Sequence, residues 1–281
     1  MFKYFLLSVC SVGLLITTSA NAVSYKINYG LHDVMVQNIK DDGALGHIKS
    51  GTSHTFGIST AFLVEHKTQN NINMLAKVEF LLDRNKDHLD PDHIPLWAIY
   101  LLEGDGQISQ LNKSNNIKWL VFMDGKQNTA NSIEREVRQF AGVGWQYNQN
   151  NFQFGANAYL GFYFIEIDDD TPVARGYTRD ELDDGESANL LELTGRYNIN
   201  ENFYLSLRGR YFSSNTSFEH LENNIDFSLA YDNFLDKDMT LNFKINYVSY
   251  DFDRFNTREV DILPWDNDTL FQLSIKMPLS I

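Results

Sequence analysis

Strict alternation of apolar and polar side chains constrains this chain more than any other feature of its sequence. It is clearest over 151–166, where even positions from Phe152 to Phe164 are apolar and odd positions from Gln153 to Tyr163 are glycine, polar or tyrosine. Successive side chains of a β-strand point to opposite faces, so this pattern predicts strands with one apolar and one polar face. The same alternation recurs in 25–32, 203–210, 225–229 and 239–247. The chain is therefore predicted to be all-β.

Counting the alternating segments predicts twelve strands. Their approximate bounds are 23–38, 52–66, 70–84, 94–104, 115–126, 133–148, 151–167, 186–198, 201–214, 221–232, 238–253 and 268–280. The fourth segment is the weakest, because 94–102 is apolar on both faces and the residues up to Ser114 fit a longer turn. An even number of strands is typical of single-chain bacterial outer-membrane barrels.

The connections between these strands alternate in length. Every second connection is short, at 67–69, 149–150, 199–200 and 233–237. The intervening connections include the longer and acidic segments 39–51, 168–185 and 254–267. Outer-membrane barrels have short periplasmic turns and longer extracellular loops. The pattern therefore predicts that both termini of the barrel lie on the periplasmic side.

The amino-terminal 22 residues predict a cleaved signal peptide. Lys3 supplies a positive charge, 5–16 is apolar, and Ala20 and Ala22 form the small-residue cleavage site. The alternative of a retained anchor helix is disfavoured, because the apolar run is shorter than the roughly 20 residues that span a bilayer. We therefore expect a signal peptide over 1–22.

The remaining residues, 23–281, are expected to form one barrel domain. The single cysteine, Cys10, lies in the signal peptide, so the mature chain contains no disulfide. No later segment is long and apolar enough for a membrane helix. A closed barrel is the other structure that satisfies every backbone group in lipid.

A soluble β-sandwich or lipocalin-like barrel is the alternative, since its strands also alternate. In a soluble barrel, however, the apolar face points inward and the charged face points out. Here the polar face carries glycines and both signs of charge. The apolar face carries aromatic residues near strand ends, as membrane-interface girdles do: Trp119, Trp145, Tyr147, Tyr197, Phe203, Tyr231 and Tyr247. We predict a transmembrane antiparallel up-and-down β-barrel in the outer membrane of a Gram-negative cell.

The carboxy-terminal strand and the net charge indicate the partners. Alternation from Thr269 to Ile281 resembles the terminal strand that barrel-assembly machinery recognises, although Ile281 replaces the usual terminal aromatic residue. A net charge of −14 argues against nucleic acid. The expected partners are outer-membrane lipid, lipopolysaccharide and the barrel-assembly machinery. The sequence leaves the oligomeric state open.

Three short segments add a family resemblance. They are Leu89-Asp90-Pro91-Asp92-His93-Ile94-Pro95, Glu166-Ile167-Asp168-Asp169-Asp170 and Ile262-Leu263-Pro264-Trp265-Asp266-Asn267-Asp268. Together with the barrel plan, they resemble the solitary autotransporter-type outer-membrane barrels, which lack an attached passenger domain. The resemblance implies fold and location and no particular activity.

The polar face is expected to line the lumen with both signs of charge. The predicted lining residues are Lys77, Glu79, Lys118, Asp124, Lys126, Glu134, Glu136, Arg138, Glu192, Arg196, Arg208, Arg210, Asp226, Lys244 and Lys276. Four of the cations come from neighbouring strands and could form a basic wall opposite Glu134 and Glu136: Arg196, Arg208, Arg210 and Lys244. Opposed walls favour a narrow channel for small charged or zwitterionic solutes. The same charges could instead form salt bridges that plug a structural or surface barrel.

Catalysis and metal binding have weaker support. The seven histidines lie in no serine-containing signature, so a barrel lipase or omptin-like protease is a distant alternative. The run from Asp83 begins like an EF-hand but has His88 at the glycine position and Ile94 at the glutamate position. Looser Ca²⁺ or Mg²⁺ binding is a hypothesis for Asp168, Asp169, Asp170, Asp183 and Asp184. No cofactor is expected.

Overall fold

The computed structural model describes residues 22–39, 51–68, 71–84, 96–128, 133–167, 183–235, 238–251 and 267–279. Within these ranges the strands are β1 (Ala22–Ile39), β2 (Gly51–Lys67), β3 (Asn73–Asp83), β4 (Leu96–Asn112), β5 (Asn115–Asn128), β6 (Ile133–Gln149), β7 (Phe152–Ile167), β8 (Asp183–Asn198), β9 (Phe203–Ser214), β10 (His220–Asp232), β11 (Thr240–Tyr250) and β12 (Asn267–Pro278). No helix in the described part of the chain is long and apolar enough to cross a membrane.

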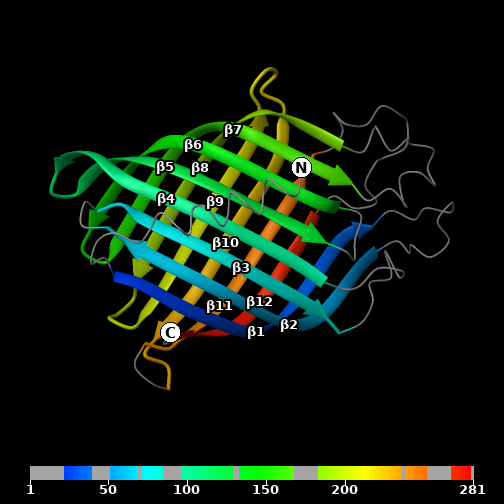
Figure 1. Cartoon of the computed structure of the whole chain (residues 1–281), viewed down its shortest axis with the longest axis horizontal. Helices are drawn as coiled ribbons and strands as arrows, with labels where there is room; N and C mark the ends of the chain where they lie inside the picture. The colour runs from blue at the N-terminus through cyan, green and yellow to red at the C-terminus, as the bar shows by residue number, and fades with distance from the viewer. Residues whose placement is uncertain are drawn as a thin grey trace.

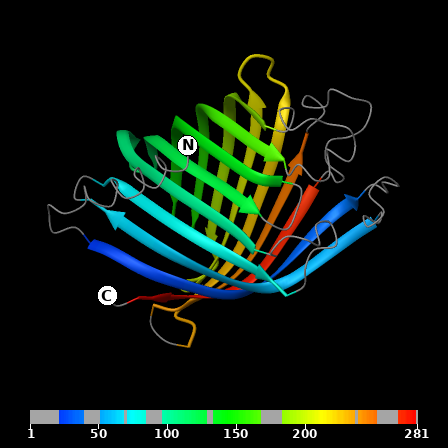
Figure 2. The ribbon, with the colours of Figure 1, turned by 45° about the vertical axis from the view of Figure 1, so that its right-hand side comes forward.

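The twelve strands form one closed barrel in which each strand pairs with its neighbours in the sequence (Figure 1). The first and last strands close it: β1, in blue, lies antiparallel beside β12, in red, from the Lys26–Pro278 pair to the Gln37–Asn267 pair. Figure 2 shows the sheet curving continuously from β1 round to β12. The predicted closed, antiparallel, twelve-stranded up-and-down barrel is confirmed.

One end of the barrel carries short turns, and we call it the short-turn end. Its connections are 68–72, 113–114, 150–151, 199–202 and 233–239, which include the four that the sequence predicts to be short. Three of the turns contain an asparagine with positive φ: Asn71 at 57°, Asn150 at 45° and Asn233 at 60°. Asparagine tolerates this left-handed conformation better than most residues, which explains its use in these turns. β1 begins and β12 ends at the same end of the barrel.

The fourth strand is longer than its sequence pattern predicts. Residues up to Ser114 were expected to form a longer turn, but β4 continues to Asn112 and only 113–114 link it to β5. The β4–β5 ladder accommodates two register shifts beyond Gln107. Asn112 Oδ1 accepts hydrogen bonds from the Ser114 backbone N–H and the Asn115 side-chain amide, which closes the turn. Backbone pairing continues here although the side chains no longer alternate.

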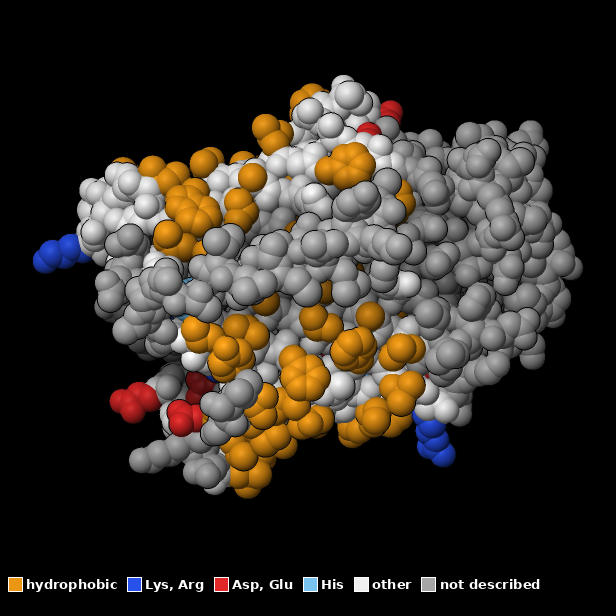
Figure 3. Space-filling view, viewed as in Figure 1, with side chains coloured by type: hydrophobic (Ala, Val, Ile, Leu, Met, Phe, Trp, Pro, Cys, Tyr) orange, Lys and Arg blue, Asp and Glu red, His pale blue; other side chains and the backbone are white. Residues whose placement is uncertain are grey.

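Apolar side chains dominate the exterior of the barrel. On the face shown in Figure 3, hydrophobic side chains gather along the sides of the barrel, and the visible charged side chains lie toward the strand ends. Leu160, for example, is 64% exposed and Leu191 60%. Near the short-turn end, aromatic side chains form clusters: the exposed Trp145 lies 5.9 Å from the half-buried Phe154 between ring centroids. The outward face is therefore a belt that needs an apolar surrounding.

The interior is not uniformly polar, which the alternation alone did not indicate. Inward-facing aromatic rings pack together on β5 to β9, with centroids 5.3 to 5.8 Å apart: Phe122, Phe140, Tyr159, Tyr163 and Phe212. They belong to a buried apolar cluster that includes Leu190 and Leu221. This cluster fills part of the barrel with side chains, so charged groups share the interior with an aromatic layer.

Candidate functional site

The charged residues predicted to line the lumen occupy inward positions wherever the structure describes their side chains. Six are buried: Glu79, Asp124, Glu136, Arg138, Glu192 and Arg210. Eight are half-buried, and all of these except Lys276 line interior cavities: Lys77, Lys118, Lys126, Arg196, Arg208, Asp226, Lys244 and Lys276. The side chain of Glu134 lies outside the described residues, as do those of the acidic cation candidates Asp168, Asp169, Asp170, Asp183 and Asp184. In the described part of the chain no group of acids, histidines or cysteines is arranged to hold a metal ion.

A chain of ion pairs crosses the barrel interior, and we call it the cross-lumen network: Asp124, Arg138, Glu192, Arg210 and Glu222. Asp124 on β5 accepts hydrogen bonds of 2.8 Å from Arg138 Nε and from Arg210 Nη1 on β9. Arg138 Nη1 on β6 lies 2.5 Å from Glu222 Oε1 on β10, and Arg210 Nε lies 2.9 Å from Glu192. Strands from opposite sides of the barrel are therefore joined through their side chains.

The cross-lumen network is almost inaccessible to solvent. Its five members are each 7% exposed or less, and Glu222 is fully buried. A buried charge is costly unless it is paired and hydrogen-bonded, and here every carboxylate has a guanidinium partner. The guanidiniums also lie over aromatic rings, with Arg138 5.4 Å from Phe212 and Arg210 4.7 Å from Phe122. The aromatic layer and the ion pairs thus form one packed unit that narrows the lumen.

A second set of contacts crosses the interior farther from the short-turn end. The Tyr250 hydroxyl on β11 donates a 2.8 Å hydrogen bond to Glu136 on β6. Lys126 Nζ on β5 lies 3.6 Å from Asp268 on β12 and 4.8 Å from the centroid of the Trp97 ring. These contacts continue the narrowing beyond the cross-lumen network.

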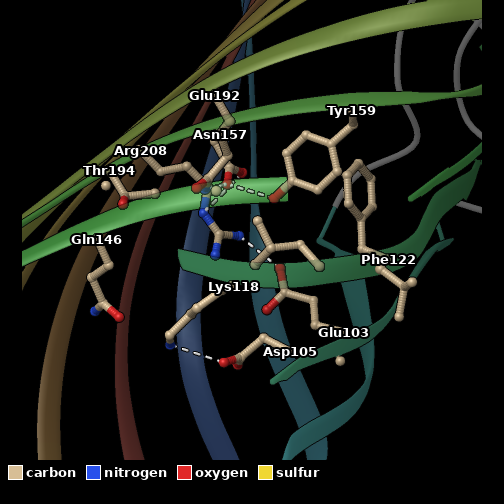
Figure 4. A pocket seen from close by; sticks show the side chains of 15 residues that line it. Glu103, Asp105, Lys118, Phe122, Gln146, Asn157, Tyr159, Glu192, Thr194 and Arg208 are labelled. Atoms are coloured by element: carbon tan, nitrogen blue, oxygen red, sulfur yellow. Dashed lines mark hydrogen bonds and ion pairs between the residues drawn. The ribbon is translucent and has the colours of Figure 1, made fainter. Parts of the chain in front are cut away.

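Charged side chains also line cavities in the part of the lumen toward the short-turn end. Figure 4 shows Arg208 reaching from β9 between Glu192 and Glu103, with Nη1 2.9 Å from Glu103 Oε1. Beside it, Lys118 Nζ contacts Asp105 at 2.9 Å. These groups line a cavity of about 180 Å³. Arg208 also lines two further cavities, of about 430 and 140 Å³, so the three spaces adjoin.

The cations of the basic wall form their ion pairs with carboxylates other than the two that the sequence places opposite the wall. Arg208 contacts Glu103 and Glu192, and Arg210 contacts Asp124 and Glu192. Glu136 instead contacts its near neighbour Arg138 and groups on other strands, Lys126 and Tyr250. Glu136 lines the same cavity of about 140 Å³ as Arg208, Arg210 and Lys244, but among the described residues its ion pairs are with Lys126 and Arg138. Alternation assigns a face to a residue, but it does not give the height of a residue along a tilted strand.

Two important carboxylates were absent from the predicted lining. Glu103 directly follows the stretch of β4 that is apolar on both faces, so alternation does not indicate which face of the strand points inward there. Glu222 follows a register shift at the start of β10, but it has the same parity as Asn224 and Asp226. Extending the alternation of 225–229 by three residues toward the start of β10 would have found Glu222.

Comparison with known proteins gives a likeness only among solved structures. No protein-family model and no curated protein sequence matches the chain. The KdgM porin in complex with disordered oligogalacturonate has 9% identity and a TM-score of 0.47, covering 91% of this chain and 99% of that one. The NanC porin has 12% identity and a TM-score of 0.48, covering 90% and 100%. The translocator domain of the autotransporter NalP from Neisseria meningitidis has 8% identity and a TM-score of 0.45, covering 99% and 95%. At these identities, the solutes and partners named for those proteins do not transfer to this chain.

Proposed function

We propose that this chain is an integral outer-membrane barrel that provides a narrow path for small charged solutes. One observation carries the proposal: adjoining cavities lined by both signs of charge extend from the short-turn end to the cross-lumen network. A polar, charged interior supports passage of charged solutes, because the lining groups replace part of their hydration. Members of the cross-lumen network line part of this path, and each is 7% exposed or less.

The membrane location rests on the exterior of the barrel. Exposed leucines and aromatic rings cover its sides, and closed antiparallel strands leave no unpaired sheet edge. Lipid is the surrounding that such a surface needs. The proposal also includes export by the predicted signal peptide and assembly by the barrel-assembly machinery. It further includes contact with lipopolysaccharide and kinship with the solitary autotransporter-type barrels.

Conductance of the refolded barrel in a planar lipid bilayer tests the channel. We expect small, discrete conductance steps in the wild type. The double substitution Arg138→Gln and Glu222→Gln should increase the step size, because it removes one cross-lumen ion pair. The matched control neutralises the exterior ion pair Asp33–His54, which joins at 3.0 Å outside the lumen, and should leave the steps unchanged. A correctly folded barrel that stays silent in all three forms would overturn the channel.

A structural barrel with a plugged lumen is the second candidate. The burial of the cross-lumen network favours it, because fully paired charges at 7% exposure or less leave little room for a solute. Such a barrel would show heat-modifiable migration on a gel and no conductance. The bilayer measurement therefore separates the two candidates directly.

A further inference from the structure

One cavity at the short-turn side of the lumen has a lining unlike the rest of the interior. Its volume is about 430 Å³, and we call it the basic lobe. Its charged lining consists of three cations and one carboxylate, namely Arg196, Arg208, Lys244 and Asp226. Neutral polar side chains supply most of the remaining surface: Gln146, Gln153, Thr194, Ser206, Ser228 and Asn242. The lobe is therefore positively charged and rich in amide and hydroxyl groups.

The three cations differ in how they are compensated. Arg208 contacts Glu103 at 2.9 Å, and Lys244 contacts Asp226 at 3.0 Å. Arg196 makes no carboxylate contact within 4 Å among the described residues. It donates instead to the side-chain oxygen of Asn198 at 3.0 Å and stacks 3.7 Å above the Tyr204 ring. The guanidinium is thus held in place while part of its charge and hydrogen-bonding capacity is left for a ligand.

We propose that the basic lobe binds a small, hydroxyl-bearing carboxylate of the sugar-acid type, with its carboxylate at Arg196. This inference rests on the proposed function and names a class of solute for it. A ligand can reach the lobe from the short-turn end, so binding does not require the cross-lumen network to open. A planar guanidinium fixed by stacking matches a carboxylate through two parallel hydrogen bonds. The amide and hydroxyl groups of the lobe then match the hydroxyls of the ligand.

The opposite side of the same end favours this orientation. A second cavity of about 400 Å³ has three carboxylates and one lysine in its lining, namely Glu65, Glu103, Asp105 and Lys67 on β2 and β4. These carboxylates already pair with the cations Lys26, Arg208 and Lys118, whereas Arg196 on β8 has no carboxylate contact among the described residues and can attract an anion. A carboxylate entering this end is therefore directed toward Arg196.

Calorimetric titration of the refolded barrel in detergent at low ionic strength tests the site. The probes are sodium gluconate, its neutral counterpart sorbitol and the cationic sugar glucosamine. We expect saturable 1:1 binding of gluconate, at least tenfold tighter than that of either other probe. Arg196→Gln should weaken gluconate binding at least tenfold. Arg196→Lys, which keeps the charge but loses the fork and the stack, should give an intermediate loss.

Lys26→Gln is the matched control. It removes the same charge at the same end of the barrel, but Lys26 contacts Glu65 at 2.6 Å and does not line the basic lobe. We expect less than a twofold change. Equal binding of gluconate and sorbitol, or equal loss in Arg196→Gln and Lys26→Gln, would overturn the site. A barrel that binds gluconate but shows no conductance would overturn the proposed channel and support the binding site in the basic lobe. A barrel that conducts but does not bind gluconate would overturn the binding site alone. Heat-modifiable migration verifies that each variant has folded.

Discussion

Arg138 joins three interior carboxylates, as many as Arg210 does. It contacts Asp124 at 2.8 Å, Glu222 at 2.5 Å and Glu136 at 3.5 Å, and its side chain is 9% exposed. Arg138 contributes more to the free energy of unfolding than a residue of a surface ion pair does. Its removal leaves the three carboxylates charged in an interior that solvates them poorly.

Arg138→Ala is therefore expected to lower the free energy of unfolding by about 3 to 5 kcal/mol. Denaturant titration of the barrel in lipid vesicles, followed by the gel-mobility shift, measures this loss. Lys26→Ala is the control, because its pair with Glu65 has side chains 27% and 40% exposed. Exposed pairs are worth about 0 to 1 kcal/mol. Similar losses in both variants would contradict the assignment of Arg138 to a buried network.

Gly161 on β7 illustrates a steric requirement at the residue scale. A Cβ atom there would lie 2.0 Å from the Gln139 backbone oxygen and 2.6 Å from the Phe140 ring, so the aromatic layer depends on the missing side chain. Gly161→Ala should lower the free energy of unfolding by about 1 to 3 kcal/mol. Gly195→Ala is the matched control, because nothing lies within 4 Å of its Cβ position. Its effect should stay within about 0.5 kcal/mol in the same denaturant titration. Equal effects would show that Phe140 does not pack against Gly161.

At the scale of the strand, alternation predicts the inward face correctly where the two faces of a strand differ in polarity, and it fails where they are alike. In β7, Leu160 and Phe162 point outward and Tyr159 and Tyr163 inward, as the sequence indicates. In β4 the two faces are chemically alike at the start of the strand, so alternation predicts neither where β4 ends nor that Glu103 points inward. The aromatic layer was missed for a related reason. Phe140 shares its parity with Arg138, and a barrel that packs its own interior accepts apolar residues on that face.

Leu160→Arg tests the lipid-facing side of β7. Leu160 is 64% exposed near the middle of the strand, so a charge there would lie in hydrocarbon. The free energy of unfolding in lipid vesicles should fall by about 2 to 4 kcal/mol. Leu111→Arg is the matched control, since Leu111 is 61% exposed but lies at the short-turn end of β4. Its loss should be about 1 kcal/mol or less. A similar cost at both positions would argue against a lipid belt centred on β7.

At the scale of the whole molecule, closure by β1 and β12 determines whether there is a lumen at all. The two strands are separated by most of the chain, and no local sequence signal specifies their pairing. The sequence predicted closure only indirectly, through the even strand count and the need to satisfy every backbone group in lipid. The register of the seam, with Leu31 opposite Leu273, came from the structure alone.

A disulfide across this seam tests the closure directly. Leu31 and Leu273 face outward on paired positions, and Cα atoms of antiparallel partners lie about 4.5 to 5.5 Å apart, within disulfide range. The mature chain carries no cysteine of its own if residues 1–22 are absent, because Cys10 is the only one. Leu31→Cys with Leu273→Cys should therefore cross-link under mild oxidation of the folded barrel, and the denatured product should migrate as a circularised chain until it is reduced.

In the control, Leu31→Cys with Phe243→Cys, the second cysteine lies at the same level one strand farther away, since Phe243 pairs with Leu273. That separation is about 9 to 10 Å, beyond the reach of a disulfide, so no cross-link should form. Cross-linking in the control but not in the seam pair would mean that β12 does not lie between β1 and β11, and the closed barrel would have to be abandoned.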